Sequence, residues 1–187
     1  MSAQITQSGQ LTQPGLPARP QDSLHELTAN STAAILTAAQ ELLIQYGRFV
    51  AAHPNVSSFC FGALEQEAAK LPQSYLDQSG GAIVAFCHTQ PVGFVAWRSL
   101  PAPELASCWE LKRLWIRPEA RGSGTGRTLV QAVLDRARAN GKCAVLLDTA
   151  PVVMAAAHRL YLQLGFLECP PYNGPSLNGI IYMQKSL

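Results

Sequence analysis

The chain has 187 residues, enough for one domain with a buried core. Its hydrophobic fraction of 48% and its charged fraction of 14% exclude a generally disordered chain. The formal net charge of +2 gives no electrostatic reason to expect a nucleic-acid partner.

The cysteines and the first residues bear on compartment and metal binding. The five cysteines are scattered, with no Cys-x-x-Cys pair and no zinc-type histidine spacing. We therefore predict no metal site, and we interpret the thiols as reduced core residues of a cytoplasmic protein. The opening MSAQITQSGQ lacks the basic start and apolar stretch of a signal peptide. No apolar run reaches the roughly 18 residues that a membrane span needs, so no membrane association is predicted.

The first residues differ in composition from the rest of the chain. Residues 1–22 are rich in Gln, Ser, Thr, Pro and Gly, a composition that buries too little apolar surface to become ordered. We predict a disordered tail over 1–22 and a single domain over 23–187.

Two helices are predicted at the start of that domain. Ser31 or Thr32 can cap a helix that ends near His53, because a proline follows. Its apolar side chains recur every three or four residues, which is typical of a helix with one face on a core. A second helix is predicted over 59–71, where Pro72 ends it.

The hydrophobic period then changes from helical to alternating. Residues 82–88 and 92–98 are β-rich runs joined by a Thr-Gln-Pro turn, which predicts a hairpin. Further elements are a strand at 110–116, a helix at 126–139, a strand at 143–149, a helix at 152–164 and a strand at 179–187. This order predicts an α/β (α+β) domain with one mixed central sheet flanked by helices.

The loop after the 110–116 strand carries the strongest functional signal. Residues 112–138 hold seven of the fourteen Lys and Arg residues and two acidic ones, a local excess of five. Glycines alternate with other residues along Arg121, Gly122, Ser123, Gly124, Thr125, Gly126 and Arg127. Absent side chains let a backbone approach its ligand, and the N-terminus of the following helix attracts anions. We predict a diphosphate site; the alternative is a glycine-rich turn with solvated arginines.

Two other phosphate-binding motifs fit this loop poorly. A Walker A loop requires glycine at the position of Arg121 and lysine at that of Arg127. The dinucleotide fingerprint requires its third glycine one residue later, with an acidic residue about 20 positions on. A nucleotide-binding protein of another fold is therefore kept only as an alternative that a ligand screen tests.

Two motifs resemble the signatures of the GCN5-related N-acetyltransferase (GNAT) superfamily. Arg121-Gly-Ser-Gly-Thr-Gly126 is similar to the Arg/Gln-x-x-Gly-x-Gly/Ala loop of that superfamily. Ala157-His-Arg-Leu-Tyr161-Leu-Gln-Leu-Gly-Phe166 is similar to its helix end, Ala-x-x-Leu-Tyr-x-x-x-Gly-Phe. The resemblance covers about residues 82–187 and implies the GNAT fold, with acetyl-CoA as the acyl donor. One position departs from it: Met154 stands where many members carry an asparagine that touches the pantetheine arm.

The resemblance also implies how the cofactor lies. Backbone groups of Leu114, Trp115 and Ile116 would pair with the pantetheine amides, as an added strand does. One of these N–H groups would face the developing oxyanion. The diphosphate would rest on residues 121–127.

Two side chains resemble catalytic residues of the superfamily. Glu110 lies eleven residues before Arg121, the offset at which histone acetyltransferases of the superfamily carry a glutamate base. The alternative for Glu110 is a structural ion pair with Lys112 or Arg113. Tyr161 resembles the general acid that protonates the leaving thiolate, and its alternative is a core aromatic.

The acceptor is less well defined by the sequence. In the superfamily the first two helices and the last hairpin shape its pocket, here residues 32–80 and 170–175. The acidic candidates there are Glu65, Glu67 and Asp77. We predict a small-molecule amine acceptor in preference to a peptide or protein, and a monomer or homodimer. The alternative is a non-catalytic module that binds acyl-CoA for regulation.

Overall fold

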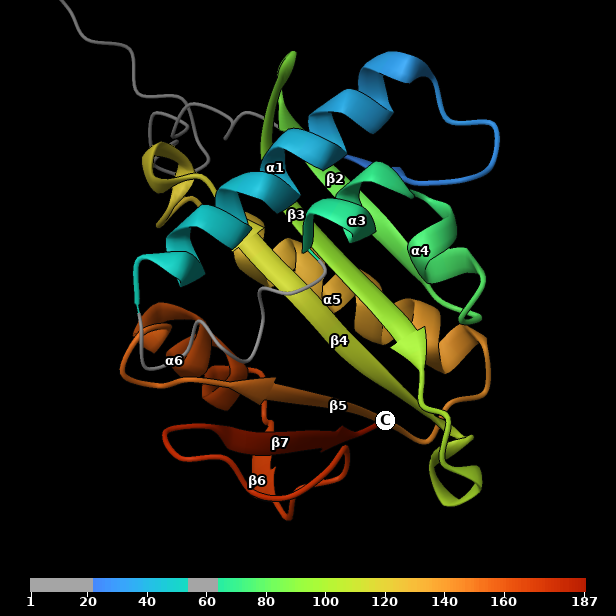
Figure 1. Ribbon diagram of the computed structural model, residues 1–187, viewed down its shortest axis with the longest axis vertical. Helices are drawn as coiled ribbons and strands as arrows, with labels where there is room; N and C mark the ends of the chain where they lie inside the picture. Colours follow the sequence, from blue (N-terminus) through green and yellow to red (C-terminus); the bar gives the residue numbers. More distant parts are fainter. Residues whose placement is uncertain (1–21, 54–63) are drawn as a thin grey trace, which may run out of the picture.

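The computed structural model describes residues 22–53 and 64–187 (Figure 1). The predicted tail up to residue 21 and the first part of the second predicted helix, 59–63, lie outside the described residues.

The described residues build one sheet of seven strands, in the order β1-β2-β3-β4-β5-β7-β6 (Figure 1). The strands are β1 Asp22–Glu26, β2 Gly81–Cys87, β3 Gln90–Ser99, β4 Cys108–Ile116, β5 Ala144–Thr149, β6 Leu167–Cys169 and β7 Ile181–Ser186. β4 and β5 run parallel, and every other neighbouring pair runs antiparallel. The mixed central sheet predicted from the sequence is confirmed.

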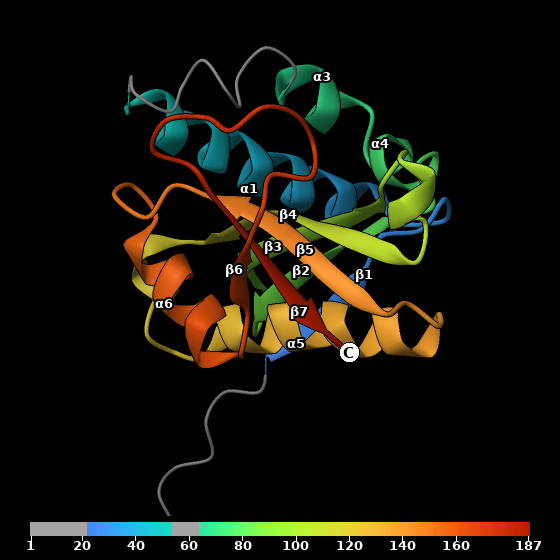
Figure 2. The same cartoon turned by 90° about the horizontal axis from the view of Figure 1, so that it is seen from below.

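Helices cover both faces of this sheet (Figure 2). One face carries α1 Ala33–Ala51, α3 Leu64–Ala69 and α4 Gln73–Leu76, and the other carries α5 Thr125–Ala139 and α6 Ala155–Gln163. Each face has its own core. Trp115 of β4 belongs to the cluster that includes α1, whereas Leu111 of the same strand belongs to the cluster that includes α5. A central strand is therefore buried on both sides.

The N-terminal helices differ in detail from their predicted ranges. Thr32 caps α1 as predicted, since its Oγ1 accepts a hydrogen bond from the N–H of Ile35 at 3.4 Å. After α3, Pro72 begins a second short helix, α4. Proline suits the start of a helix because the first N–H groups there need no partner within the helix.

Two strands were not predicted from the sequence, and one predicted turn lies one residue from its expected place. β1 begins at Asp22, within the predicted tail, and pairs antiparallel with β2. β6 has only three residues, and its Leu167 is 70% exposed. Both strands lie at the edges of the sheet and bury too few side chains for a clear alternating pattern. The β2–β3 turn falls at His88 and Thr89, one residue earlier than predicted.

The sheet opens between its two parallel strands. β4 pairs with β5 only over Cys108–Glu110, although β4 continues to Ile116. β5 stays paired with β7 along its whole length, so β4 and β5 diverge (Figure 1). On its other edge, β4 has a bulge: the register with β3 shifts between Phe94 and Ala96, and Arg113 has a φ of 59°. We call the region between residues 111–116 and β5 the β4–β5 fork.

Candidate active site

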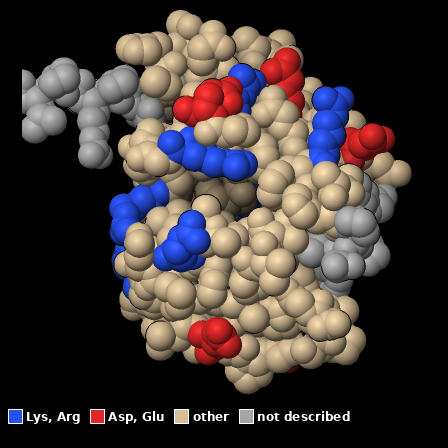
Figure 3. All heavy atoms as spheres, turned by 90° about the vertical axis from the view of Figure 1, so that its left-hand side faces the viewer, with Lys and Arg blue, Asp and Glu red and all other residues tan. Residues whose placement is uncertain are grey.

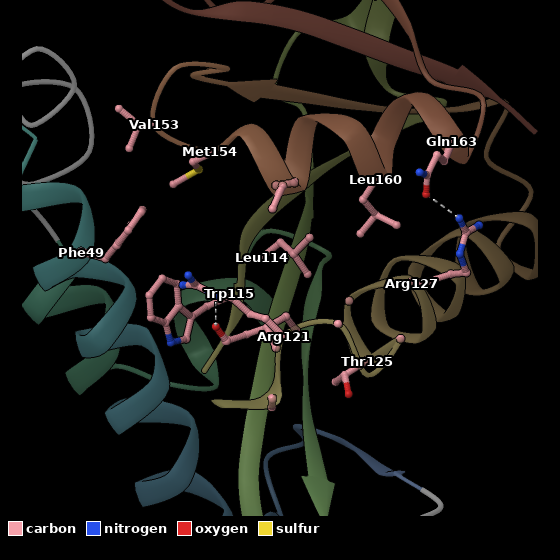
Figure 4. Close-up of a pocket in the computed structure, with 17 residues that line it drawn as sticks. Phe49, Leu114, Trp115, Arg121, Thr125, Arg127, Val153, Met154, Leu160 and Gln163 are labelled. Carbon is pink, nitrogen blue, oxygen red and sulfur yellow. Dashed lines mark hydrogen bonds between the residues drawn. The ribbon is translucent and has the colours of Figure 1, made fainter. Parts of the chain in front are cut away.

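A cleft of about 350 Å³ lies in the β4–β5 fork (Figure 4). Four parts of the chain form its wall: α1, the end of β4, the loop leading into α5, and α6 with the residues before it. The lining residues are Phe49, Leu114, Trp115, Ile116, Ala120, Arg121, Gly122, Gly124, Thr125, Gly126, Arg127, Val153, Met154, Ala156, Ala157, Leu160 and Gln163. Every residue predicted from the sequence to hold the cofactor lines this cleft, except Ser123.

The glycine-rich loop forms one wall of the cleft through its main chain. Gly122 and Gly124 have φ values of 81° and 99°, in the left-handed region that favours glycine. Gly124 is the N-cap of α5 and has no side chain to cap the helix, while Oγ of Ser123 accepts a hydrogen bond from the N–H of Thr125 at 3.3 Å. The N-terminus of α5 therefore presents a positive dipole end at the cleft. Ser123 has an internal role: its hydroxyl donates to the carbonyl of Ala120 at 2.8 Å.

The third glycine of the loop, Gly126, differs from the other two because it has no positive φ and lies in a packed position. A Cβ atom on Gly126 would lie 3.3 Å from Cδ2 of Leu160 and 3.6 Å from Cγ1 of Ile116. Glycine thus allows α5 to lie close to α6 and β4. The alternating glycines therefore serve the turn at two positions and helix packing at the third.

Two arginines stand at the cleft. Arg121 lies over the Trp115 ring, 5.0 Å from its centroid, and its Nε donates to the carbonyl of Ile116 at 3.2 Å (Figure 4). Arg127 donates to Oε1 of Gln163 at 3.0 Å. Each guanidinium has five N–H donors, so both retain donors for a ligand. Figure 3 faces the open side of the fork and shows basic side chains around a hollow.

Met154 lies at the opposite end of the cleft from Arg127 (Figure 4). It is the N-cap of α6 and packs, with Val153, against the core cluster that includes α1. This position therefore offers a ligand an apolar thioether in place of the amide that many members of the superfamily carry there.

Tyr161 lies on α6 beside the cleft. Its side chain is 5% exposed and its ring centroid lies 5.6 Å from that of Phe166, in the core cluster under α5 and α6. Tyr161 is not among the described residues that line the cleft, although Ala157 and Leu160 of the same helix are. Burial, with Tyr46 and Asp148 nearby, raises the pKa of the Tyr161 phenol far above its usual value. The phenol is therefore protonated at neutral pH.

Glu110 is the last residue of β4 that pairs with β5, and its side chain is fully buried. Its carboxylate accepts hydrogen bonds from Nε of Arg98 at 2.6 Å and Nζ of Lys112 at 3.4 Å. Tyr172 and Asn173 add donors at 3.1 and 3.3 Å. The ion pair with Lys112 that the sequence suggested is present, and Arg98 is a partner that the sequence analysis missed.

The predicted alternative pair between Glu110 and Arg113 is absent among these contacts. Arg113 instead donates two hydrogen bonds to Glu67, at 3.1 and 2.9 Å. Tyr75 donates to the same carboxylate. Glu67, one of the acidic candidates for binding the acceptor, is therefore already paired within the protein.

The surroundings of Glu110 act on its pKa in opposite directions. Burial alone would raise the pKa of this carboxyl, because a charge is costly away from water. The charges of Lys112 and Arg98, with the hydrogen bonds from Arg98 and Tyr172, outweigh burial and hold the pKa below its usual value. Glu110 is therefore ionised at neutral pH.

A second, polar cleft of about 310 Å³ lies beside α3 and α4. Its lining residues are Gln66, Glu67, Lys70, Ser74, Tyr75, Gln78, Arg98, Lys112 and Arg113. Lys112 and Arg113 line this cleft, and the next residue of β4, Leu114, begins the wall of the fork cleft. The two clefts are thus neighbours along one strand, on either side of the bulge.

The part of the chain that the structure describes offers no cluster of three or more His, Cys, Asp or Glu residues suited to a metal ion. Across the same residues, no helix combines the length and apolar character needed to cross a bilayer.

Comparison with known proteins assigns this chain to a family. The profile of the Acetyltransferase (GNAT) family matches residues 46–166, which is more than half of the chain. The chain therefore belongs to the Acetyltransferase (GNAT) family.

Relatives with similar sequences carry N-acetyltransferase names. An uncharacterized N-acetyltransferase of Schizosaccharomyces pombe is 31% identical over 128 residues, covering 68% of this chain and 76% of the yeast protein. N-acetylaspartate synthetase of Danio rerio is 32% identical over 132 residues, covering 70% of this chain and 45% of the synthetase. The chain therefore spans less than half of the synthetase.

Solved structures share the fold at low sequence identity. The PaiA N-acetyltransferase of Thermoplasma acidophilum, in complex with coenzyme A, gives a TM-score of 0.63 at 17% identity, covering 89% of this chain and 99% of that one. The YncA structure of Salmonella typhimurium, with acetyl-CoA, gives 0.66 at 17% identity, covering 89% and 94%.

Proposed function

We propose that this protein transfers the acetyl group of acetyl-CoA to the amine of a small molecule. The observation that supports it best is the fork cleft, which joins an unpaired edge of β4 to a glycine-rich helix N-terminus flanked by two arginines. A pantetheine arm has amides that can pair with a strand edge, and a diphosphate suits the helix N-terminus.

In this proposal, the cofactor lies along the fork. The diphosphate contacts the main chain of residues 122–126, with Arg121 and Arg127 as charged partners. The pantetheine arm runs along Leu114–Ile116 and occupies the place of a strand between β4 and β5. The apolar Met154 packs against the arm from the α6 side. The thioester carbonyl then reaches the bulge at Arg113, next to the residues of β4 that line the polar cleft.

The acceptor amine must be neutral before it attacks the thioester. An alkyl ammonium has a pKa near about 10, so a proton must leave at neutral pH. We assign this step to Glu110 acting through water, because the carboxylate is fully buried. Its lowered pKa means that the proton is passed on to solvent and is not retained. Glu110→Gln should then move the pH–rate profile to higher pH, and an unmoved profile would exclude Glu110 as the base.

Tyr161 is the proposed partner of the leaving sulfur. Its phenol keeps its proton, because burial raises its pKa. A thiol has a pKa near about 8.5, so the thiolate is the weaker base of the two. Tyr161 therefore stabilises the departing thiolate mainly by donating a hydrogen bond, and the thiolate takes its final proton from solvent.

We further propose that the acceptor carries a carboxylate beside its amine. Four basic side chains line the polar cleft: Lys70, Arg98, Lys112 and Arg113. The carboxylates that pair with them are only three, those of Glu67, Glu110 and Asp148. One positive charge is left over, and Lys70 has no ion pair among the described residues. An acidic acceptor would complete the charge balance. The relative named N-acetylaspartate synthetase supports this choice, since its name gives an N-acetylated amino acid as product.

The cofactor assignment is tested by comparing coenzyme A with pantetheine, which lacks the diphosphate. Arg121→Ala and Arg127→Ala should each weaken coenzyme A binding about tenfold, measured by calorimetry, and leave pantetheine binding unchanged. Arg138→Ala is the matched control, because Arg138 pairs with Asp135 at the far end of α5. Equal losses for both ligands, or no loss, would contradict a diphosphate on this loop.

The acceptor assignment is tested with paired amines that differ by one carboxylate, such as phenylalanine and phenethylamine. Turnover with acetyl-CoA should favour the amino acids. Lys70→Ala should raise the KM for these acceptors roughly tenfold, without changing coenzyme A affinity. Equal rates within each pair would contradict a carboxylate-bearing acceptor. Coenzyme A binding without turnover of any amine would instead support the regulatory module.

A further inference from the structure

Two cysteines meet at the closed end of the β4–β5 fork. Cys108 begins β4, and Cys143 directly precedes β5. Their sulfur atoms lie 3.8 Å apart, and the N–H of Cys143 donates to the carbonyl of Ser107 at 2.9 Å. The sequence predicted that the thiols lie in the core, and this is wrong for Cys143, which is exposed. A reagent in solution can therefore reach one member of the pair.

The two thiols have different surroundings. The Sγ of Cys143 lies 3.1 Å from the hydroxyl of Ser107. This hydrogen bond and the one from Cys108, with Lys142 nearby, lower the pKa of Cys143. Cys108 is buried, and burial raises its pKa. The exposed thiol is thus the better nucleophile, and the buried thiol is held beside it as its partner.

We propose that Cys108 and Cys143 are a peroxide-sensitive dithiol that closes to an intrachain disulfide. The Cys143 thiolate attacks hydrogen peroxide, the O–O bond breaks, and a hydroxide leaves and is protonated to water. The Cys108 thiol then attacks the sulfenic acid of Cys143, the S–O bond breaks, and the leaving hydroxide takes the Cys108 proton. Two thiols are oxidised, one peroxide is reduced, and two waters form.

The backbone already suits this bond. Cys108 pairs in register with Ala144, and Cys143 directly precedes Ala144, so the two cysteines are diagonal neighbours where β4 and β5 begin. Adjacent strands lie about 4.8 Å apart and a strand rises about 3.3 Å per residue, so diagonal neighbours have Cα atoms roughly 6 Å apart, within the range of about 4.4–6.8 Å that a disulfide spans. The sulfurs need to move closer by roughly 2 Å, within reach of side-chain rotation. The bond would join β4 to β5 where they are already paired, away from the fork cleft.

The first test is oxidation of the full chain with hydrogen peroxide, followed by mass spectrometry without reduction. The chain should lose about 2 Da, the two thiol hydrogens. Trypsin should release residues 99–112 linked to 143–159, peptides that contain Cys108 and Cys143 as their only cysteines. Cys169→Ser is the matched control and should form the same link. Linkage of either residue to Cys87 or Cys169, or dimers in place of an intrachain bond, would overturn the proposal.

A second test follows each thiol separately. In Cys108→Ser, oxidation should stop at a sulfenic acid on Cys143 that dimedone traps; in Cys143→Ser, Cys108 should stay unmodified. The oxidised wild type should melt roughly 5 °C higher than the reduced form, whereas Cys143→Ser should show no such shift. Oxidation of Cys143 only to sulfenic or sulfinic acid in the wild type, with no rise in Tm, would overturn the proposal.

Discussion

Glu110 shows how one side chain can serve stability and chemistry together. Four donors from three parts of the chain meet on its carboxylate: Arg98 of β3, Lys112 of β4, and Tyr172 and Asn173 of the loop before β7. A buried charge is tolerated when it is fully paired, and removing one partner leaves the others uncompensated. The same donors hold the carboxylate in its charged form beside the polar cleft.

Glu110→Gln should lower the free energy of unfolding by roughly 2–3 kcal/mol at pH 7. The folded pKa of Glu110 lies below its unfolded value, so its stabilisation is present above pH about 4.3 and is lost as the pH falls through the folded pKa. The difference between wild type and variant should therefore shrink below pH about 4, as measured by denaturant unfolding. Glu26→Gln is the control: Glu26 also pairs with an arginine, but it is exposed, so at most about 1 kcal/mol should be lost.

Tyr161→Phe separates hydrogen bonding from packing, because only the hydroxyl is removed. We expect kcat to fall about 100-fold while the Kd for coenzyme A changes little. The raised pKa of Tyr161 keeps the phenol neutral across the assay range, so the shape of the pH–rate profile should stay the same. Tyr182→Phe, which alters another buried tyrosine, should keep kcat within about twofold. Unchanged turnover in Tyr161→Phe would restrict Tyr161 to the core.

At the scale of elements, α5 offers a direct comparison between its two ends. Gly124 begins the helix with a φ of 99°, and Gly141 follows its end with a φ of 68°. Alanine at either position adopts this conformation at a cost of about 1–2 kcal/mol. Gly124→Ala should therefore lower both the Tm and the affinity for coenzyme A, the latter about tenfold by calorimetry. Gly141→Ala should lower the Tm alone; a matching loss of affinity would mean that strain anywhere in α5 weakens binding.

The helices, the central strands and the loop over 121–127 could be predicted from the sequence, because each depends on residues that are neighbours in the chain. Period and caps define α1 and α5, and alternating glycines between arginines define the loop. The fork could not be predicted, since it depends on where β4 stops pairing with β5. The polar cleft could not be predicted for a similar reason, because Lys70, Arg98 and Lys112 come from three separate segments of the chain.

At the scale of the molecule, cofactor binding should stabilise the whole domain. A ligand that binds only the folded state at 100 times its Kd adds about 2.7 kcal/mol, or roughly 5–10 °C in Tm for a chain of this size. Coenzyme A and acetyl-CoA should both produce this shift in a thermal melt, and ATP and NAD should not. A shift with ATP but none with coenzyme A would favour a nucleotide-binding protein of another kind.

Because β4 pairs with β5 only over Cys108–Glu110, hydrogen exchange of β4 can show whether the fork cleft holds a ligand. Along residues 111–116, one edge of β4 has no neighbouring strand on the β5 side, so main-chain amides directed there face water when the cleft is empty. Deuterium from heavy water should enter these positions quickly and then be slowed once a pantetheine chain covers them. Exchange at the amides of residues 111–116 that are directed away from β3 would therefore report binding directly, before any acceptor is identified.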